Sequence, residues 1–461
     1  MIHLAIDIGA SSGRHMIGYL QGGKIVLEEI YRFPNGAKSV DGSLCWDSEE
    51  LFFHIKEGLK RAKTLGKIPA TVSIDTWAVD YVLLDQKDRA IGKVYSYRDE
   101  RTRVSSKLVH DVIPFETLYQ KTGIQFQYFN TVYQLYADKL SGKLDRAEAM
   151  LMLPDYFHFL LTGVKKQEYT NATSTGMVNA RTHTWDREMM DALGLPEKLF
   201  LPLSQPGTVV GDFTDQIARE IGYRATVVLP ATHDTASAVL AAPLSDKNAL
   251  YLSSGTWSLL GVEEDFAYTD EKSRAFNFSN EGGLGCTFRF QKNIMGLWMI
   301  QQVRHELNDA YSFAELASLA RKNPCSDRVD CNDQRFLSPA SMIGEIENAV
   351  GRSMTVGELA YCIFASLAQC YDKAVKELSS MTGKAYTSLN IIGGGCNNRL
   401  LNELTARETN LKIMTGPSEA TAIGNMLMQM IASGEISGIR EGREIIKKSF
   451  DIEEVSFYGS L

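Results

Sequence analysis

The segment ATHDTASAV, residues 231–239, contains a carboxylate whose position suits proton transfer. Asp234 stands between the strand-like run TVVLP, residues 226–230, and an alanine-rich helical stretch. Phosphoryl transfer to an alcohol needs a carboxylate that accepts the hydroxyl proton as the new bond forms. The local sequence by itself favours a plain helix N-cap instead. The two roles are compatible, since a carboxylate at a helix start is expected to keep a low pKa and stay ionised.

Two loops of small residues are suited to holding phosphate. GASSGR, residues 9–14, follows the first apolar strand, and SSGT, residues 253–256, follows a later one. Backbone N–H groups in such loops can turn inward around phosphate oxygens. Either loop alone is more often an ordinary turn, but two of them, each opening one half of the chain, favour a nucleotide site. The motif GxxxxGK[ST] is absent from the sequence, which disfavours the P-loop class.

A glycine run and a strand aspartate extend this interpretation. Gly393-Gly394-Gly395 follows an apolar strand, where bare backbone allows close approach of a flat base or ribose; a flexible turn is the alternative. Asp7 interrupts the apolar first strand, and a carboxylate there is unfavourable unless it is paired or bound to metal. Mg²⁺ that accompanies ATP would suit it; a hydrogen-bonded residue at a strand end is equally compatible.

Two segments combine tryptophan with polar groups, as sugar sites do. They are IDTWAVD, residues 74–80, and KNIMGLW, residues 292–298. An indole ring can stack on a sugar while the neighbouring polar groups bind its hydroxyls. For either segment taken singly, a tryptophan in the hydrophobic core is the stronger interpretation.

The elements that must position these residues recur in two related halves. The chain opens with strands at residues 4–8, 15–20 and 24–30, followed by a helix that starts at Asp47, and residues 249–263 again read as strand, turn and strand. In the first helix an acidic residue three positions after Asp47 resembles a capping box, and four apolar residues share one face: Leu51, Ile55, Leu59 and Ala62.

A long helix in the second half has clear boundary signals. Thr355 with Glu358 forms a capping-box pattern, and Gly383 is suited to the C-cap. We therefore expect an α/β protein with two domains, residues 1–243 and 244–461, which begin with similar hairpins.

Composition limits the classes of function. Of 461 residues, 44% are hydrophobic and 23% charged, which is ordinary for a globular protein of more than one domain. The formal charge of −8 argues against nucleic acid or an anionic membrane as a partner. The start of the chain lacks the pattern of a signal peptide. We expect a cytoplasmic protein without a membrane or nucleic-acid partner.

The seven cysteines are scattered without a CxxC pair or zinc spacing. This pattern favours reduced thiols. A local disulfide between Cys325 and Cys331 is the alternative.

In order, these motifs resemble the FGGY carbohydrate kinases over nearly the whole chain, to about Asn425. The segments that carry the resemblance are DIGASSGR (7–14), IDTWAVDYVLLD (74–85), YRDERT (97–102), LMLPDYFHFLLTG (151–163), EYTNATSTGMVN (168–179), HDTASAV (233–239), YLSSGTWSLLG (251–261), NEGG (280–283), KNIMGLW (292–298), IIGGGCNNRLLN (391–402) and GPSEATAIGN (416–425). Within the family, the combination of HDTASAV, KNIMGLW and GASSGR is similar to the members that act on L-rhamnulose.

The resemblance implies two actin-like ATPase domains of the ribonuclease H-like type, facing each other across a cleft that closes on the sugar. It implies that residues 1–243 bind the sugar and carry the base and that residues 244–461 bind the nucleotide. It implies that ATP and L-rhamnulose give L-rhamnulose 1-phosphate and ADP in L-rhamnose catabolism, with Asp234 as the base and Mg²⁺ contacted by Asp7. Residues implied to bind the nucleotide are Ala10, Ser11, Ser12, Gly13, Arg14, Thr256, Gln301 and Gly394. Residues implied to bind the ketose are Ala78, His233, Asp234, Thr235 and Asn293.

Two positions depart from family patterns. Ala78 stands where the L-rhamnulose kinases often have glycine, and the added methyl group would narrow the sugar pocket. Ala10 replaces the threonine of the wider family, as is typical of that subfamily. A kinase of another ketose, such as L-fuculose or L-xylulose, is the first alternative. An actin-like ATPase of the chaperone or filament type, or a sugar sensor without catalysis, is the alternative of another class.

Overall fold

The computed structural model describes residues 1–455, which form two compact units. The first unit comprises residues 1–241, 263–290 and 421–449, and the second comprises residues 242–262, 291–420 and the described residues from 450 onward. A single boundary at residue 243 does not describe these units fully, because the later segments 263–290 and 421–449 belong to the first unit. The assignment of sugar and nucleotide binding to residues 1–243 and 244–461 stays a prediction.

A six-stranded sheet organises the first unit. Its strands run in the order β14-β15-β6-β1-β2-β3. The parallel pairs are β1 with β6 and β6 with β15, whereas β1–β2, β2–β3 and β14–β15 are antiparallel. The strands are β1 (His3–Ile8), β2 (Ser12–Gln21), β3 (Lys24–Pro34), β6 (Thr71–Thr76), β14 (Val209–Asp212) and β15 (Thr226–Val228).

The second large sheet repeats this arrangement in the order β18-β19-β17-β16-β20-β21-β22. An antiparallel hairpin, β16–β17, is followed across the sheet by two parallel partners, β20 and β21, and by an antiparallel edge strand, β22. The strands are β16 (Ala249–Ser254), β17 (Trp257–Glu264), β18 (Ser279–Gly282), β19 (Phe288–Met295), β20 (Ser388–Ile392), β21 (Lys412–Thr415) and β22 (Glu453–Val455). The prediction of two related α/β halves is confirmed.

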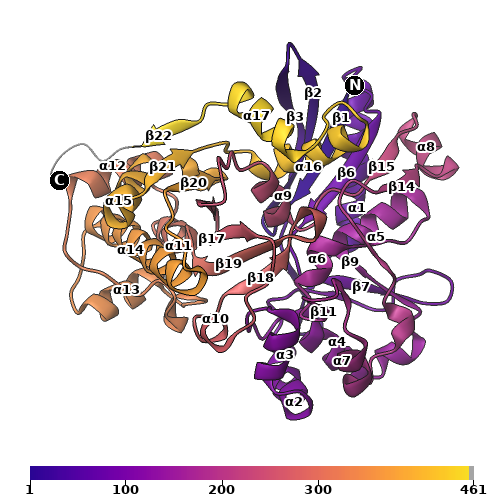
Figure 1. Cartoon of the computed structure of the whole chain (residues 1–461), viewed down its shortest axis with the longest axis horizontal. Helices are drawn as coiled ribbons and strands as arrows, with labels where there is room; N and C mark the ends of the chain where they lie inside the picture. The colour runs from indigo at the N-terminus through magenta and orange to yellow at the C-terminus, as the bar shows by residue number, and fades with distance from the viewer. Residues whose placement is uncertain (456–461) are drawn as a thin grey trace. The chain divides into compact units, whose positions relative to one another are not determined.

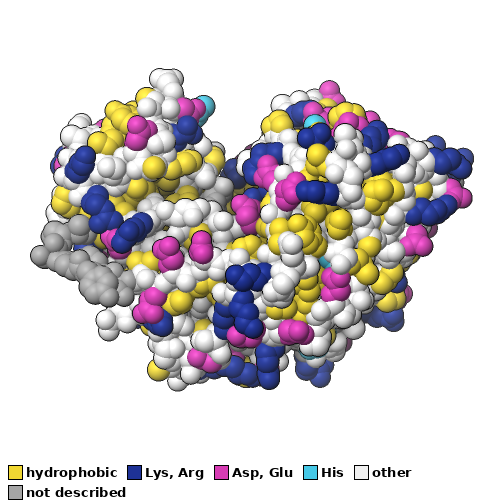
Figure 2. Space-filling model, turned by 90° about the horizontal axis from the view of Figure 1, so that it is seen from above, with side chains coloured by type: hydrophobic (Ala, Val, Ile, Leu, Met, Phe, Trp, Pro, Cys, Tyr) yellow, Lys and Arg dark blue, Asp and Glu magenta, His cyan; other side chains and the backbone are white. Residues whose placement is uncertain are grey.

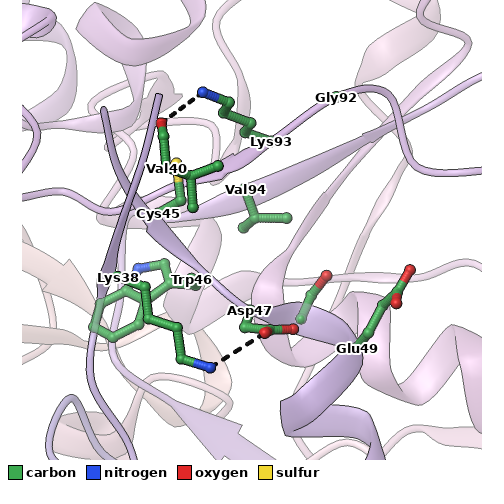
Figure 3. A pocket seen from close by; sticks show the side chains of 10 residues that line it. Lys38, Val40, Cys45, Trp46, Asp47, Glu49, Gly92, Lys93 and Val94 are labelled. Carbon is green, nitrogen blue, oxygen red and sulfur yellow. Dashed lines mark hydrogen bonds and ion pairs between the residues drawn. The ribbon is translucent and has the colours of Figure 1, made fainter. Parts of the chain in front are cut away.

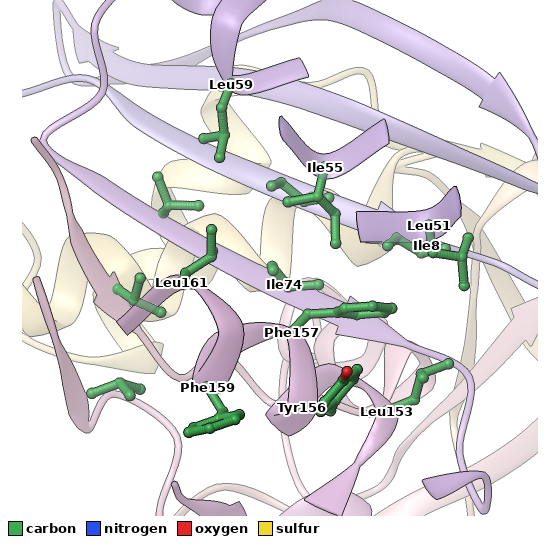
Figure 4. Packing of buried hydrophobic residues seen from close by; sticks show 14 of the residues in the cluster. Ile8, Leu51, Ile55, Leu59, Ile74, Leu153, Tyr156, Phe157, Phe159 and Leu161 are labelled. Atoms are coloured by element: carbon green, nitrogen blue, oxygen red, sulfur yellow. The ribbon is translucent and has the colours of Figure 1, made fainter. Parts of the chain in front are cut away.

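Helices α1 (Ser48–Thr64) and α5 (Leu153–Thr162) build the hydrophobic core of the first unit. The Asp47 side chain accepts a hydrogen bond from the Glu50 N–H and caps α1, as the sequence predicts. The four apolar positions predicted for its inner face are all buried. Figure 4 shows Leu51, Ile55 and Leu59 from α1 packed with residues of α5 and with the strand residues Ile8 and Ile74.

Helix α16 (Ala420–Ala432) packs against the first sheet although it lies some 400 residues later in the chain. The Gln429 side chain donates to the Leu4 carbonyl oxygen at 3.0 Å, and in Figure 1 the yellow α16 lies beside the indigo β1. Close approach depends on glycine, because a Cβ at Gly18 would lie 1.6 Å from the Met426 sulfur. Strand alternation separates the faces: Leu4, Ile6 and Ile8 enter the core with α1, and the residues between them point the other way.

The long helix of the second unit is α14 (Val356–Thr382). Its capping box joins Thr355 and Glu358, and Gly383 adopts the left-handed conformation at its C-terminus, as predicted. It packs against α12 (Phe313–Lys322) and α15 (Arg399–Thr409).

The remaining elements complete the two units. The other α-helices are α2 (Thr102–Val112), α3 (Phe115–Thr122), α4 (Thr131–Leu140), α6 (Tyr169–Thr173), α7 (Arg187–Leu193), α8 (Asp215–Ile221), α9 (Asp234–Leu240), α10 (Glu271–Ala275), α11 (Trp298–Glu306), α13 (Met342–Val350) and α17 (Ile439–Ser449). The 3₁₀ helices are η1 (Lys143–Arg146), η2 (Glu197–Leu199), η3 (Leu284–Cys286), η4 (Gln334–Phe336) and η5 (Gly394–Asn397). The short strands are β4 (Lys38–Val40), β5 (Ser43–Trp46), β7 (Tyr81–Leu84), β8 (Val94–Tyr95), β9 (Ala149–Met152), β10 (Gln167–Glu168), β11 (Val178–Asn179), β12 (Thr184–Trp185) and β13 (Leu203–Ser204).

The surface carries charges of both signs, interspersed over the face seen in Figure 2. Within residues 1–455, no helix combines the length and the apolar character that crossing a bilayer requires. Cys325 and Cys331 are both free thiols.

Two buried histidines make the stability of the first unit sensitive to acid. Burial lowers the pKa of His15 to about 3 and that of His158 to about 3, from an ordinary 6.5. His158 Nε2 accepts the Ile74 N–H at 3.0 Å, which requires an unprotonated nitrogen. The folded chain therefore keeps both rings neutral at a pH where the unfolded chain binds protons.

We expect the free energy of unfolding to be fully retained above pH 6.5 and to fall as the pH drops from 6.5 toward 3. Each histidine contributes about 1.4 kcal/mol per pH unit in that window. Urea unfolding at pH 6.5 and pH 5.5 measures this slope. His158→Gln should reduce it, and substitution of the exposed His305 should not; equal slopes in all three proteins would contradict the assignment.

Candidate active site

Three aspartates meet where neighbouring parallel strands of the first sheet end. Asp7 on β1 is paired in register with Asp75 on β6. The Thr76 N–H donates to the Thr232 carbonyl oxygen at 3.0 Å, which holds the segment after β15 at the same edge and places Asp234 there. The carboxyl ends of parallel strands are the usual place for ligands in α/β sheets.

The predicted phosphate loop leads directly out of this edge. The Gly9 N–H donates to the Ser12 carbonyl oxygen at 2.9 Å and closes the turn between β1 and β2. Arg14 then reaches back, and its Nε and Nη2 donate to Asp7 Oδ2 at 3.0 and 2.9 Å. Ala10 and Ser11 lie in the turn, whereas Ser12, Gly13 and Arg14 already belong to β2. The structure therefore brings the predicted phosphate and magnesium residues of this segment together.

Asp234 is the first residue of α9, and its N-cap is His233. Its Oδ1 accepts hydrogen bonds from the Thr235 N–H at 2.5 Å and the Thr235 hydroxyl at 3.2 Å. The side chain keeps about 30% of its surface exposed. The carboxylate is thus held by its neighbour and still open to a substrate. The interpretation of Asp234 as a plain N-cap is wrong, because His233 occupies that position and the carboxylate accepts only from the adjacent Thr235.

Burial and like charges make Asp234 a stronger base than an ordinary aspartate. Burial raises its pKa, His233 partly offsets this, and the negative charge of Asp7 raises it further. The expectation of a low pKa at a helix start is therefore wrong, because desolvation and a second carboxylate outweigh the helix start and the hydrogen bonds from Thr235. A raised pKa favours proton acceptance from an alcohol.

Asp75 is the most perturbed member of the group. Burial first, and then the charges of Asp7 and Asp234, raise its pKa well above the ordinary value. Asn425 on α16 donates to Asp75 Oδ2 at 2.5 Å, and Asp75 Oδ1 is buried without a hydrogen-bond partner among residues 1–455. Asp75 lies in the segment IDTWAVD and, like Asp7, on an apolar strand, but it had no predicted role of its own.

Ala78, predicted to contact the ketose, lies in a strained turn after β6. The Asp80 N–H donates to the Ala78 carbonyl oxygen at 3.0 Å, and the intervening Val79 has a φ of 68°. A β-branched residue in that region is rare and is maintained only by its surroundings. Here the Thr131 hydroxyl donates to the Val79 carbonyl oxygen at 2.7 Å.

Asp80 anchors the same turn and explains the tryptophan. Its Oδ2 accepts the indole N–H groups of Trp46 and Trp77, at 2.6 and 2.9 Å, and both rings are buried with centroids 4.1 Å apart. Trp77 therefore belongs to the core, as the stronger of the two interpretations held. Burial raises the pKa of Asp80 to about 6.

Glu168 holds the segment that carries Asp234 from a second direction. Its Oε2 accepts the Thr232 N–H at 3.1 Å and the Thr232 hydroxyl at 2.8 Å. The same carboxylate accepts the N–H groups of Thr170 and Asn171 at the start of α6. Sequence analysis quoted this residue in a motif and gave it no role.

The predicted nucleotide residues of the second unit meet around the turn between β16 and β17. The Trp298 N–H donates to the Thr256 carbonyl oxygen at 3.2 Å, so this turn lies against the start of α11, which carries Gln301. On its other side, a Cβ at Gly395 would lie 1.9 Å from Ser254 Oγ, so only glycine allows the turn after β20 to pack there. Gly394 faces open space. Thr256, Gln301 and Gly394 thus lie on three segments that gather at the ends of β16 and β20.

Asn293, the last predicted ketose residue, lies on β19 in the second unit. Its Oδ1 is buried and has no hydrogen-bond partner among the described residues. An unsatisfied buried amide oxygen is unfavourable in a native protein, so a donor from a ligand or water would stabilise it.

A cavity of about 200 Å³ lies beside the start of α1 and is shown in Figure 3. Its lining residues are Lys38, Val40, Cys45, Trp46, Asp47, Ser48, Glu49, Gly92, Lys93 and Val94. None of them is a predicted site residue. Lys38 Nζ lies 3.3 Å from Asp47 Oδ2, and Lys93 Nζ donates to the Val40 carbonyl oxygen at 2.6 Å, so both cations are engaged by the protein.

The carboxylates fit a magnesium ion that arrives with a nucleotide. Within residues 1–455, no cluster of three or more His, Cys, Asp or Glu side chains is arranged to hold a metal by itself. Mg²⁺ commonly takes one or two carboxylates and fills its other positions with phosphate oxygens and water. Arg14 Nε and Nη2 both donate to Oδ2 of Asp7, and the adjacent Asp75 Oδ1 has no hydrogen-bond partner within residues 1–455. This donor set suits such an ion.

The family models match both halves of the chain. The N-terminal domain of the FGGY family of carbohydrate kinases matches residues 2–241, and its C-terminal domain matches residues 250–433. The chain belongs to the FGGY family of carbohydrate kinases. Curated FGGY relatives are similar over nearly their full length. A protein named rhamnulokinase from Halalkalibacterium halodurans is 48% identical, covering 98% of this chain and 97% of its own, and one from Bacillus subtilis is 44% identical, covering 98% and 95%.

Solved structures confirm the fold of this FGGY kinase. A xylulose kinase from Lactobacillus acidophilus superposes with a TM-score of 0.80 at 18% identity, covering 99% of this chain and 94% of its own. A gluconate kinase from the same organism gives 0.79 at 18% identity with the same coverage. The predicted fold class, two actin-like ATPase domains, is confirmed, and ATP is the phosphoryl donor that the family implies.

Two neighbouring glycines allow the nucleotide prediction to be tested. We expect Gly394→Ala to leave stability within about 0.5 kcal/mol of the parent, because a methyl group there meets no protein atom, and to weaken ADP binding. Gly395→Ala should instead destabilise the fold by about 1–3 kcal/mol, because its methyl group overlaps Ser254. Urea unfolding and isothermal titration with ADP measure both effects. Unchanged ADP affinity in Gly394→Ala would remove Gly394 from the nucleotide site.

Proposed function

We propose that this chain is an ATP-dependent kinase that transfers the γ-phosphoryl group to the 1-hydroxyl of L-rhamnulose, in L-rhamnose catabolism in the cytoplasm. The observation that carries the proposal is the position of Asp234. Its carboxylate lies in one unit with Asp7 and Arg14, at the strand edge from which the small-residue turn emerges. The relatives named rhamnulokinase, at 41–48% identity, support the choice of ketose.

Asp234 would accept the proton of the attacking hydroxyl. Its carboxylate is exposed enough to reach a ligand, and its raised pKa makes it a better base. The Thr235 N–H holds Oδ1 in place, which orients the carboxylate before the sugar binds. Orientation of this kind lowers the barrier because the base needs no rearrangement at the moment of transfer.

The nucleotide would be held by backbone amides and small side chains. The N–H groups and hydroxyls of residues 10–13 would bind the phosphates, with Arg14 adding positive charge, and Thr256, Gln301 and Gly394 would complete the site. Asp7 would hold Mg²⁺, which would neutralise phosphate charge when bound. Asp75 Oδ1, beside it, has no hydrogen-bond partner among the described residues and would be available for a further contact.

The ketose would be bound by Ala78, His233, Thr235 and Asn293. The strained turn at Val79 fixes the backbone of Ala78, so the methyl group of Ala78 has little freedom to move aside. A sugar smaller at that position, such as a five-carbon ketose, is therefore the specific competitor to L-rhamnulose.

Replacing the base should abolish turnover without loss of the nucleotide. We expect Asp234→Asn to lower kcat by at least about 100-fold while ADP affinity stays near that of the parent, because the amide cannot take the proton. Asp215→Asn is a matched control, since Asp215 also begins a seven-residue helix but is exposed and pairs with Arg224. Full activity in the Asp234 variant would overturn the assignment.

A panel of ketoses would identify the substrate. ADP release should be fastest with L-rhamnulose and slower with L-fuculose and L-xylulose, measured at equal enzyme and ATP. If the enzyme preferred another ketose, the proposed kinase activity would stand and the proposed substrate would be replaced. ATP turnover that is independent of every sugar would instead favour an actin-like ATPase of the chaperone type, and sugar binding without turnover a sensor.

A further inference from the structure

A buried charged pair lies beside Nδ1 of His233, the ring nitrogen that does not face Asp234. Glu281 on β18 and Arg289 on β19 belong to the same unit as His233, and Arg289 is only 1% exposed. Arg289 Nη2 lies 3.0 Å from Glu281 Oε2 and 3.2 Å from His233 Nδ1. Arg289 Nε donates to the Gly282 carbonyl oxygen at 3.1 Å, which fixes the plane of the guanidinium.

The chemistry of arginine favours a proton on one particular nitrogen of His233. A guanidinium has only donors, so a hydrogen bond between Arg289 Nη2 and His233 Nδ1 requires a lone pair on Nδ1. The ring proton of a neutral His233 then resides on Nε2. Glu281 Oε2, 3.1 Å from Nδ1, would favour the opposite tautomer if it acted alone. Glu281 Oε2 also accepts a hydrogen bond from Arg289 Nη2, which holds the guanidinium where it can donate to Nδ1.

We propose that Arg289, held by Glu281, is a positioning residue that fixes His233 as the Nε2–H tautomer. His233 Nε2 lies 3.5 Å from Asp234 Oδ1. With the proton on Nε2, an N–H group faces the Asp234 carboxylate and any substrate oxygen beside it. With the proton on Nδ1, a lone pair on Nε2 would face the same oxygens.

The surroundings of Asp234 explain why that tautomer matters. Asp234 already shares its environment with the negative charge of Asp7. A lone pair on His233 Nε2, 3.5 Å from Asp234 Oδ1, would add to the electrostatic repulsion at this carboxylate. An N–H group at the same position reduces the repulsion and can donate to a ketose oxygen. This inference rests on the proposed function for its catalytic consequence, but the tautomer itself is a property of the protein without substrate.

The tautomer is measurable in the unmodified protein. Nitrogen-15 NMR of histidine-labelled protein distinguishes a protonated from an unprotonated Nδ1, and the His233 signals are assigned by their loss in His233→Gln. We expect His233 Nδ1 unprotonated and Nε2 protonated. A proton on Nδ1, donated to Glu281, would overturn the proposal whether or not the chain phosphorylates L-rhamnulose.

Variants separate the tautomer from simple charge balance. Arg289→Met should move the His233 proton to Nδ1 and lower kcat/KM for the ketose by about 10- to 100-fold, the effect of losing a hydrogen bond from a charged group, with ADP affinity retained. Arg289→Met combined with Glu281→Gln removes the stranded carboxylate but does not restore the donor. We expect this double variant to remain impaired; full recovery would show that Arg289 only neutralises Glu281.

A partly buried ion pair elsewhere in the same unit provides the control. Arg443 Nη1 lies 2.9 Å from Glu263 Oε2, and the arginine side chain is 13% exposed. We expect Arg443→Met to lose stability while the His233 NMR signals and kcat/KM stay unchanged. If it altered both as Arg289→Met does, the effect would be general destabilisation and the proposal would fail. Should Arg289→Met not fold, the wild-type tautomer still decides.

Discussion

The register between β1 and β6 is the constraint on which the site depends. Parallel pairing sets Asp7 directly opposite Asp75, and the alternation of a strand sends both side chains to the face away from the core of α1 and α5. A shift of one residue would bury the carboxylates among Ile8, Ile55 and Phe157 and expose the apolar side chains. The hydrophobic face of the strands therefore fixes where the charges gather.

Concentrated negative charge has to be compensated by the rest of the unit. Arg14 pairs with Asp7, and Asn425 donates to Asp75. Gln429, one helical turn after Asn425 on α16, donates to the backbone of β1, so a helix from the far end of the chain supports both strands. The remaining imbalance appears as the raised pKa values of Asp75 and Asp234. The charge that is costly for folding is the property that a general base requires.

The second sheet has the same strand arrangement as the first but different residues at its strand ends. Its hairpin and parallel partners repeat the order of the first sheet, but the strand ends carry glycine, serine and threonine in place of carboxylates. Ser254 and Gly395 pack so closely that backbone, not side chain, forms the surface at Gly394. One topology thus presents charged side chains in one unit and bare backbone in the other.

The sequence alone determined the elements and the local chemistry. The caps of α1 and α14, the apolar face of α1, the two small-residue turns and the family motifs all depend on residues close together in the chain, where side-chain type and spacing fix the outcome. Asp234 and the turn at residues 9–14 were found for that reason.

Only the tertiary structure decided the partners, the burial and the pKa values of the site residues. Asp75, Glu281 and Arg289 gain their roles from partners that lie between 8 and 350 residues away. The local motifs that contain Asp75 and Glu281 do not reveal those partners. The pKa of Asp234 is raised, whereas its place at a helix start predicted a low value. The difference arises because burial and the charge of Asp7 depend on the folded surroundings. The sequence determines which groups are present, but their electrostatic energies are set by distance and desolvation, which exist only once the strands have paired.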